Sequence, residues 1–456
     1  IEPSVKKIYF LGIGLLLLHV LILSNLGFTA WPEMFSFPYL VNNGFLIYKD
    51  FHHAYQPFLT LVLSIVYGLF GYELLTLKIF TWVLILISDM LILAISVKLL
   101  GKRLVATLPL FIFVLLGPLF EGNMLWFDLA TVPLLLSSTY FLFGWLDSKK
   151  KKQLFWSGFF LGLCFLTKQQ SVLFLFAYAT LFWLKKVKLK EIVYFGLGGG
   201  LPIALTFLSL LSFGVFKDYL FWTFYFPLYH LPKIPGYAIL PTLKQLLILG
   251  ILLLPAILVF LKRPRKPQTI FLVASLLAAV AASLPRFSFF HLQPAIVIFS
   301  LLIGLATIQS SKLWLFFPFL TFLVLLRQNL GLFSMPTRFY DEEAKRLAEV
   351  VSRETFLAEK VYLLGPHSLI YVLSGRVPPK PWIESYVWHF EIPGMQEKLI
   401  EGFEKEPPEI ILWTEPRAGQ WYDLATYQPA KIAGWVRENY AKKMKVGNNV
   451  WLWRIK

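Results

Sequence analysis

The sequence predicts a polytopic α-helical membrane protein with a C-terminal extracytoplasmic α/β domain. Hydrophobic residues make up 57% of the 456 residues, and runs of about twenty residues with few or no charges recur along the chain. Only ten of the 26 carboxylates precede residue 337, as expected where charge next to hydrocarbon is costly. These features exclude an ordinary soluble globule.

Clusters of lysine and arginine between the apolar runs set the expected topology, because such clusters stay on the cytoplasmic side. An even number of crossings must then separate consecutive clusters. Three apolar segments lie between the first two clusters, and the shortest, Phe58 to Phe70, is too short to span; we expect it to be interfacial or re-entrant. The clusters are Lys6 and Lys7; Lys98, Lys102 and Arg103; Lys149 to Lys152; Lys185 to Lys190; Lys262 to Lys266; and Lys312.

The other apolar segments predict about eleven transmembrane helices, with the N-terminus in the cytoplasm. The first span follows two lysines as a secretory signal would, but it lacks a small-residue cleavage site, so we expect it to be retained. The expected spans are Ile8–Phe28, Leu74–Val97, Leu104–Phe120, Phe127–Leu146, Leu154–Phe165, Ser171–Leu184, Ile192–Phe213, Leu243–Leu261, Thr269–Leu284, Leu292–Ile308 and Leu313–Leu330.

Composition divides the chain near residue 335. We expect residues 1–335 to form the membrane domain, with a large first external loop at 29–73, and residues 336–456 to form a soluble extracytoplasmic domain, since sixteen carboxylates lie in this last part. Helical and strand periods alternate there, which predicts a small α/β layer domain. The expected helices are Asp341–Arg353, Met395–Phe403 and Ile432–Tyr440, and the expected strands are Val361–Leu364, Ile410–Trp413 and Val450–Trp453.

The net charge of +17 indicates a membrane partner rather than nucleic acid. The basic residues fall in short clusters between apolar spans and not along one amphipathic face. This distribution fits the positive-inside pattern and attraction to anionic lipid head groups. We therefore expect a multi-pass protein of the cell membrane with membrane lipids as partners and no nucleic acid.

Acids and histidines near the first loop are the first candidate site residues, because carboxylates gathered at one membrane face are a functional-site hypothesis. Glu33 is a candidate general base, since partial desolvation raises a carboxyl pKa; the alternative is a solvated loop acid. Asp50 could orient the loop or bind a metal with His52, although adjacent histidines such as His52 and His53 are a weak metal signal. Asp128 opens a helix and is a candidate for catalysis or substrate binding, or it complements the helix dipole.

Cations on the same expected side are candidate phosphate ligands. Lys168 lies between two short apolar segments, and Lys78 and Arg286 are its companions; arginine suits phosphate because it can bind in a bidentate way. The alternative for each cation is an aliphatic stem in the apolar layer with the charge among lipid head groups. Further candidates for substrate contact are Gln169, Glu121 and His291.

Several short motifs occur in a recognisable order. They are Asn43-Gly44, Tyr48-Lys49-Asp50-Phe51 and Gln56-Pro57 in the first loop, then Leu69-Phe70-Gly71, Gly162 to Gln169, and Arg286 to Pro294. Together they resemble the membrane-embedded glycosyltransferases of the GT-C class, and most closely the protein O-mannosyltransferase and aminoarabinose transferase group, family 39-like. The likeness covers most of the membrane part. Three features depart from it: Glu33 stands where aspartate is commoner, His53 to Pro57 breaks up the usual proline pair, and Lys78 replaces an arginine.

The resemblance implies transfer of a sugar from a polyprenyl-phosphate donor to an acceptor hydroxyl or amine at the outer face, with inversion at the anomeric carbon. It assigns the catalytic acid of the first loop to Glu33, the second-loop acid to Asp128 and the phosphate-contacting lysine to Lys168. The acceptor would be a protein, a lipid or a glycan. No cofactor is required, and a divalent cation, magnesium or manganese, is compatible with this chemistry.

Three alternative functions stay open. One is a non-catalytic scaffold, which a lack of convergence among Glu33, Asp128 and Lys168 would favour. A polymerase or ligase of lipid-linked glycans shares the same outer-face chemistry. A lipid or solute transporter or flippase would often show inverted repeats and interrupted helices near the bilayer midplane, and the sequence shows no such repeat.

Overall fold

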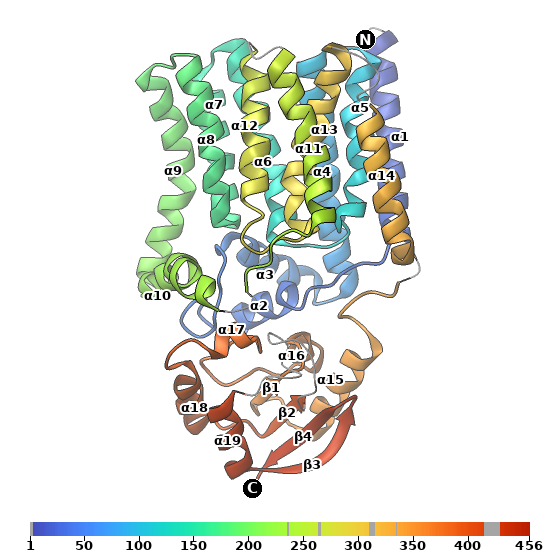
Figure 1. The fold of residues 1–456 in the computed structure, drawn as a ribbon. Coiled ribbons are helices and arrows are strands. Elements are labelled where there is room, and N and C mark those ends of the chain that lie inside the picture. The colour runs from blue at the N-terminus through green and yellow to red at the C-terminus, as the bar shows by residue number, and fades with distance from the viewer. Residues whose placement is uncertain (1–2, 235–236, 263–265, 310–314, 334, 415–428) are drawn as a thin grey trace. The chain divides into compact units, whose positions relative to one another are not determined.

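A computed structural model of the chain contains many apolar helices and one small mixed sheet (Figure 1). It describes residues 3–456 except 235–236, 263–265, 310–314, 334 and 415–428. Internal contacts divide the chain into two compact units. The bundle unit comprises Ile1–Thr29, Leu77–Leu208 and Ile239–Pro336, and the sheet unit comprises Ala30–Thr76, Ser209–Ala238 and Thr337–Lys456. The first loop thus belongs to the same compact unit as the C-terminal residues. The division into a membrane domain, 1–335, and an extracytoplasmic domain, 336–456, stays a prediction.

The bundle unit is helical in its described part, and its helices run side by side (Figure 1). Its α-helices are α1 (Pro3–Asn25), α4 (Leu74–Leu100), α5 (Leu108–Leu116), α6 (Phe127–Ser148), α7 (Lys151–Thr167), α8 (Leu175–Leu184), α9 (Leu189–Ser212), α11 (Leu243–Lys262), α12 (Pro267–Ala281), α13 (Gln293–Gln309) and α14 (Phe316–Asn329). Its 3₁₀ turns are η1 (Leu104–Thr107), η2 (Pro118–Phe120), η3 (Gln169–Phe174), η6 (Phe289–Leu292) and η8 (Leu330–Phe333).

The helices confirm the predicted class, a multi-pass helical membrane protein. Among the described residues, five helical stretches are long and apolar enough to cross a membrane, and five further apolar helices are shorter. The number of crossings stays a prediction. Residues 263–265 and Lys312 of the basic clusters, and the start of the predicted span Leu313–Leu330, lie outside the described residues.

Buried polar contacts tie the first helix of the bundle to its neighbours. Nδ1 of His19 on α1 lies 2.8 Å from Oδ2 of Asp89 on α4, and both side chains are buried. An unpaired charge at that place would be strongly destabilising. The side-chain amide of Asn123 donates to the carbonyls of Leu23 and Leu26 at 3.0 and 2.9 Å, so it caps the end of α1, whose last carbonyls have no partner within the helix.

Glycines let the backbones of α7 and α9 approach closely. A Cβ atom on Gly198 would clash with the carbonyl oxygen of Phe155, and one on Gly158 would clash with the carbonyl oxygen of Phe195. Small residues at such crossings are how helices in membranes pack backbone against backbone. Gly200, on the same helix as Gly198, has open space where its Cβ would be.

We predict that Gly198→Ala destabilises the protein and that Gly200→Ala does not. The added methyl group at residue 198 must push α7 away from α9, which we expect to lower the free energy of unfolding by about 1–3 kcal/mol. The matched control at residue 200 should stay within about 0.5 kcal/mol of wild type. Thermal unfolding of the detergent-solubilised protein measures both, and equal effects would contradict the packing role.

The sheet unit mixes helices with a four-stranded sheet. Its helices are α2 (Glu33–Asn42), α3 (Phe58–Phe70), α10 (Phe216–Leu220), the π-helix η4 (Phe221–His230), the 3₁₀ turn η5 (Leu231–Lys233), α15 (Glu342–Glu354), α16 (Leu369–Ser374), α17 (Val387–Phe390), α18 (Met395–Lys405) and α19 (Ala430–Asn439). The helix α2 was not predicted, because the polar residues of this segment indicated a loop. It packs against α3 and α16.

The sheet has the order β1-β2-β4-β3. Its strands are β1 (Val361–Leu364), β2 (Ile410–Thr414), β3 (Tyr440–Gly447) and β4 (Val450–Ile455). β1 and β2 are parallel, with Val361 opposite Ile410, and the other two pairs are antiparallel. The strand β3 was missed because Lys442, Lys443 and Lys445 hide any apolar alternation; lysines are common on edge strands, where they discourage pairing with other chains.

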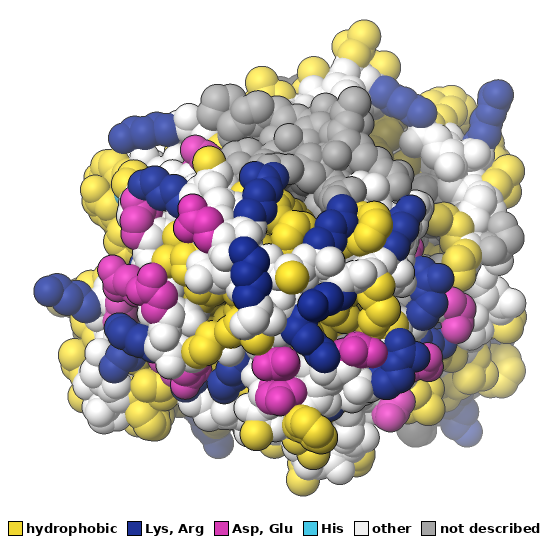
Figure 2. All heavy atoms as spheres, turned by 90° about the horizontal axis from the view of Figure 1, so that it is seen from below, with side chains coloured by type: hydrophobic (Ala, Val, Ile, Leu, Met, Phe, Trp, Pro, Cys, Tyr) yellow, Lys and Arg dark blue, Asp and Glu magenta, His cyan; other side chains and the backbone are white. Residues whose placement is uncertain are grey.

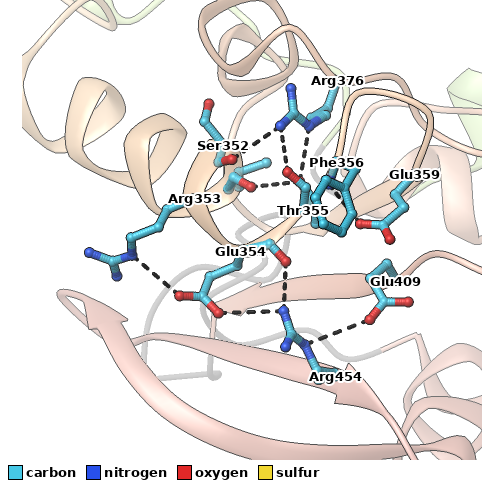
Figure 3. Close-up of polar contacts among 10 residues, drawn as sticks. Ser352, Arg353, Glu354, Thr355, Phe356, Glu359, Arg376, Glu409 and Arg454 are labelled. Carbon is cyan, nitrogen blue, oxygen red and sulfur yellow. Dashed lines mark hydrogen bonds and ion pairs between the residues drawn. The ribbon is translucent and has the colours of Figure 1, made fainter.

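Two arginines cap the C-terminal end of α15 (Figure 3). The buried guanidinium of Arg376 donates to the carbonyls of Ser352 at 3.1 Å and Thr355 at 2.6 Å. The guanidinium of Arg454 donates to the carbonyl of Glu354 at 2.6 Å. The last carbonyls of a helix have no partner within it, so these contacts satisfy them and attach α15 to β4 and to the segment after α16.

Basic and acidic side chains are mixed over the face drawn in Figure 2. Exposed ion pairs of the sheet unit, such as Lys345 with Glu342 at 2.7 Å, belong to this kind of surface. Surface pairs of this kind contribute little to stability.

Candidate functional site

Two buried ionisable side chains and a partly buried histidine meet in the bundle unit. Oδ1 of Asp128 lies 2.6 Å from Nζ of Lys168, and Oδ2 lies 2.7 Å from Nδ1 of His291. Nζ of Lys168 is also 3.5 Å from Nδ1 of His291. Asp128 and Lys168 are 2% and 4% exposed. We call these three residues the bundle cluster.

Helix ends position the bundle cluster. Asp128 lies in the first turn of α6, where a negative charge complements the helix dipole. Lys168 directly follows α7, and its backbone N–H donates to the carbonyl of Cys164. His291 lies in η6, just before α13. The carboxylate balances the buried lysine, so the cluster can hold charge inside an apolar bundle.

The other candidates of the bundle unit have contacts of their own, and the charge of Arg286 also acts on His291. Ser288 donates to the exposed carboxylate of Glu121 at 3.3 Å. Nζ of Lys78 lies 5.6 Å from the ring centre of Phe28. Gln169 starts η3 directly after Lys168. Arg286 forms an isolated bridge with Ile239.

A second buried cluster lies in the sheet unit. Glu33, in the first turn of α2, is 6% exposed. Its Oε1 accepts a 2.8 Å hydrogen bond from the hydroxyl of Tyr386, while its buried Oε2 has no hydrogen-bond partner among the described residues. Glu384 is equally buried, and it is hydrogen-bonded with the hydroxyl of Ser368. We call these four residues the acid cluster.

Burial governs the protonation of the two acids. It raises the pKa of Glu33 above its usual value. Burial and then the charge of Glu33 raise the pKa of Glu384 to about 8. A carboxyl pKa moved toward neutrality suits a group that accepts a proton in catalysis.

The histidines of the first loop lie beside the acid cluster. The ring centre of His52 is 4.0 Å from that of His389 and 4.5 Å from that of Trp222. Nδ1 of His53 lies 2.8 Å from the carbonyl of Tyr55, and its Nε2 lies 2.8 Å from the hydroxyl of Thr60. Burial lowers the pKa of His53 to about 4, so this ring is neutral and holds the loop together.

Asp50 is engaged in local contacts. Its Oδ2 accepts from the backbone N–H of Leu46 at 2.9 Å and from Nζ of Lys380 at 2.8 Å. These contacts favour the alternative in which Asp50 orients the loop. In the described part of the chain, no group of three or more histidine, cysteine, aspartate or glutamate side chains is arranged to hold a metal ion. Both carboxylate oxygens of Asp128 already contact nitrogen atoms of Lys168 and His291. These candidate acids therefore do not fit a resident divalent cation.

Three residues of this region were missed by the sequence reasoning: Glu384, Tyr386 and His389. They belong to the C-terminal segment, whose composition is that of a water-soluble protein, and in such a protein a carboxylate is normally exposed. The one signal was the density of aromatic residues around two ionisable groups in Trp382 to Phe390.

Comparisons with known proteins agree with the fold. Residues 52–210 match the family described as dolichyl-phosphate-mannose-protein mannosyltransferase. The chain is similar to the structure of ArnT from Cupriavidus metallidurans in the apo state, with a TM-score of 0.65 and 11% identity over 97% of each chain. ArnT bound to undecaprenyl phosphate gives a TM-score of 0.64 and 11% identity, covering 98% of this chain and 97% of that one.

The oligosaccharyltransferase of Archaeoglobus fulgidus in the apo form is also similar, with a TM-score of 0.58 and 13% identity over 98% of this chain and 74% of that chain. No curated protein matches the sequence. The chain therefore shares the fold of these solved structures, as the order of its motifs suggested.

We predict that Asp128→Asn destabilises the protein strongly. The amide leaves the buried ammonium of Lys168 without its anion, and removing one partner of a buried pair costs about 3–5 kcal/mol. Asp147, whose carboxylate is 3.9 Å from Nζ of Lys98 and largely exposed, provides the control: Asp147→Asn should change stability by less than about 1 kcal/mol. Thermal unfolding compares the two, and a small effect at residue 128 would mean that the cluster is not ionised.

Proposed function

We propose that this chain transfers a sugar from a polyprenyl-phosphate donor to an acceptor hydroxyl or amine, with inversion at the anomeric carbon. The observation that carries the proposal is the bundle cluster, a buried lysine and a partly buried histidine held by Asp128 in a chain of the GT-C fold. The family matched by residues 52–210 and the undecaprenyl phosphate in a similar structure support a lipid-phosphate donor.

The proposed reaction breaks the bond between the anomeric carbon and the phosphate oxygen of the donor while the acceptor oxygen or nitrogen bonds to that carbon. The departing polyprenyl phosphate gains negative charge, which Lys168 and His291 are suited to stabilise in surroundings of low dielectric. Asp128 holds both side chains in place. Lys78, Arg286 and Gln169 are proposed as further donor contacts.

Glu33 is the proposed base that takes the proton of the acceptor. Its support is burial, a raised pKa and the hydroxyl of Tyr386, which fixes the orientation of its carboxylate. Asp50 is proposed to act indirectly, by closing the loop that carries His52 and His53. Glu121 is proposed as a polar contact for the substrate.

We predict separable losses for Glu33→Gln and Lys168→Met. The first should lower turnover by about 10²–10⁴-fold, because a general base contributes about that much, with little change in KM for the donor. The second should weaken donor binding. The assay incubates the purified protein with polyprenyl-phosphate sugars and a mixture of protein, lipid and glycan acceptors, and it measures the lipid phosphate released.

The exposed Glu404 provides the control, since Glu404→Gln should leave turnover unchanged. Equal turnover of Glu33→Gln and wild type would remove Glu33 from its role. Release of a carrier that had borne an oligosaccharide would favour the polymerase or ligase alternative. If no donor releases lipid phosphate, the transporter or flippase alternative is favoured.

We also propose that the active site and residues 336–456 lie outside the cytoplasm, because the basic clusters between apolar spans are expected to lie inside. The single cysteine, Cys164, is buried, so an introduced thiol can report on its side. We predict that a membrane-impermeant maleimide labels Glu404→Cys in intact cells and labels Lys149→Cys only after permeabilisation. The reverse pattern would contradict this topology.

A further inference from the structure

A surface groove lies between the end of α8 and the start of α9, two helices of the bundle unit (Figure 1). Its volume is about 710 Å³, which falls in the range of small-molecule sites, about 300–1,000 Å³. Phe182 of α8 meets Phe195 of α9 edge to face, with ring centres 5.2 Å apart. Six of the seven residues that line the groove are apolar, and the seventh is Lys186. The groove is therefore an apolar channel with one cation.

The backbone holds Lys186 beside the groove in an unusual conformation. Its φ of 48° is left-handed, which is uncommon for a residue other than glycine and is usually taken by glycine after a helix. The backbone N–H of Lys186 donates to the carbonyl of Trp183 at 3.1 Å. Trp183 also lines the groove and is 79% exposed. Exposed tryptophan beside lysine is typical of the boundary between membrane and water.

The positive charge of Lys186 is not balanced within the described part of the chain. The nearby carboxylate of Glu191 is engaged elsewhere: it accepts from the indole N–H of Trp145 and from the backbone N–H of Lys188, each at 3.3 Å. Nζ of Lys149, in another basic cluster, lies 4.3 Å from the ring centre of Trp145. Lys186 is exposed and has no ion pair or ring contact among the described residues. Its ammonium group is thus available to an anion from outside the protein.

Two bland explanations account for the charge of Lys186 but not for the groove. A lysine after a helix complements the helix dipole, and a basic cluster is attracted to anionic head groups in general. Neither requires an apolar channel beside the ammonium group. A soluble anion would leave the apolar walls against water, whereas a lipid has both a phosphate for the cation and a tail for the walls.

We infer that the groove binds an anionic membrane phospholipid. Its phosphate contacts the ammonium group of Lys186, and one acyl chain lies along Phe182 and Ile192. The site differs from the bundle cluster, because η3 and the whole of α8 separate Lys186 from Lys168 along the chain. The inference goes beyond the proposed transfer reaction and does not depend on it.

Native mass spectrometry of the full-length protein, released from detergent micelles, tests the inference. Phosphatidylglycerol and phosphatidylcholine with the same acyl chains are titrated separately, and the fraction of protein that carries one lipid is measured. We expect wild type to bind phosphatidylglycerol more tightly. Lys186→Gln should weaken this binding by about fivefold, the contribution of one lysine near an anionic lipid, and should leave the binding of phosphatidylcholine unchanged.

Lys190→Gln is the matched control, because Lys190 is an exposed lysine of the same basic cluster that does not line the groove. It should leave the affinity for phosphatidylglycerol unchanged. Ala179→Trp tests the apolar part: Ala179 lines the groove, and the indole should displace the acyl chain and weaken binding although Lys186 is retained.

Equal losses in Lys186→Gln and Lys190→Gln would overturn the inference, because the attraction would then belong to the whole basic cluster. A wild type without preference for phosphatidylglycerol would overturn it too, as would displacement of the lipid by soluble glycerol phosphate. If Ala179→Trp does not fold, the two lysine variants decide alone, since both lysines are exposed. No turnover is measured, so a chain without transferase activity would refute the proposed function and leave this result intact.

Discussion

Burial of Asp128 at the start of an apolar helix is the constraint on which the bundle site depends. A carboxylate that is 2% exposed stays charged only where cations or donors surround it. Lys168 and His291 provide these contacts from two other segments, so one ionic cluster joins the start of α6, the end of α7 and the turn before α13. It also holds an ammonium group in surroundings of low dielectric, where its attraction for a phosphate is strong.

The acid cluster meets the same constraint in another way. Glu33 and Glu384 have no cation beside them in the described part of the chain, and burial raises the pKa of both. The pKa values are raised because burial disfavours the charged form of each carboxyl. The two solutions have different uses: a fixed cation suits a departing phosphate, whereas a carboxylate with a raised pKa suits a proton that must be taken up and released.

Sequence reasoning succeeded where signals are local. Apolar length predicted the membrane helices. Polar residues at helix ends drew attention to Asp128, Lys168 and His291; the structure shows their mutual contacts, and their roles stay a proposal. Their contacts join residues 40 and 163 positions apart, and no periodicity encodes such pairing. Glu384 was missed because a glutamate in a water-soluble segment is normally exposed. The sequence alone could not decide whether Asp50 binds a metal or orients the loop, because its contact with Lys380 joins residues 330 positions apart.

A structure determined with bound undecaprenyl phosphate tests the central claim most directly. If the bundle cluster binds the phosphate of the donor, a phosphate oxygen will lie within about 3 Å of Nζ of Lys168, with Asp128 still in contact with the lysine or with His291. A phosphate bound elsewhere, with all three side chains of the cluster paired only with one another, would contradict the claim.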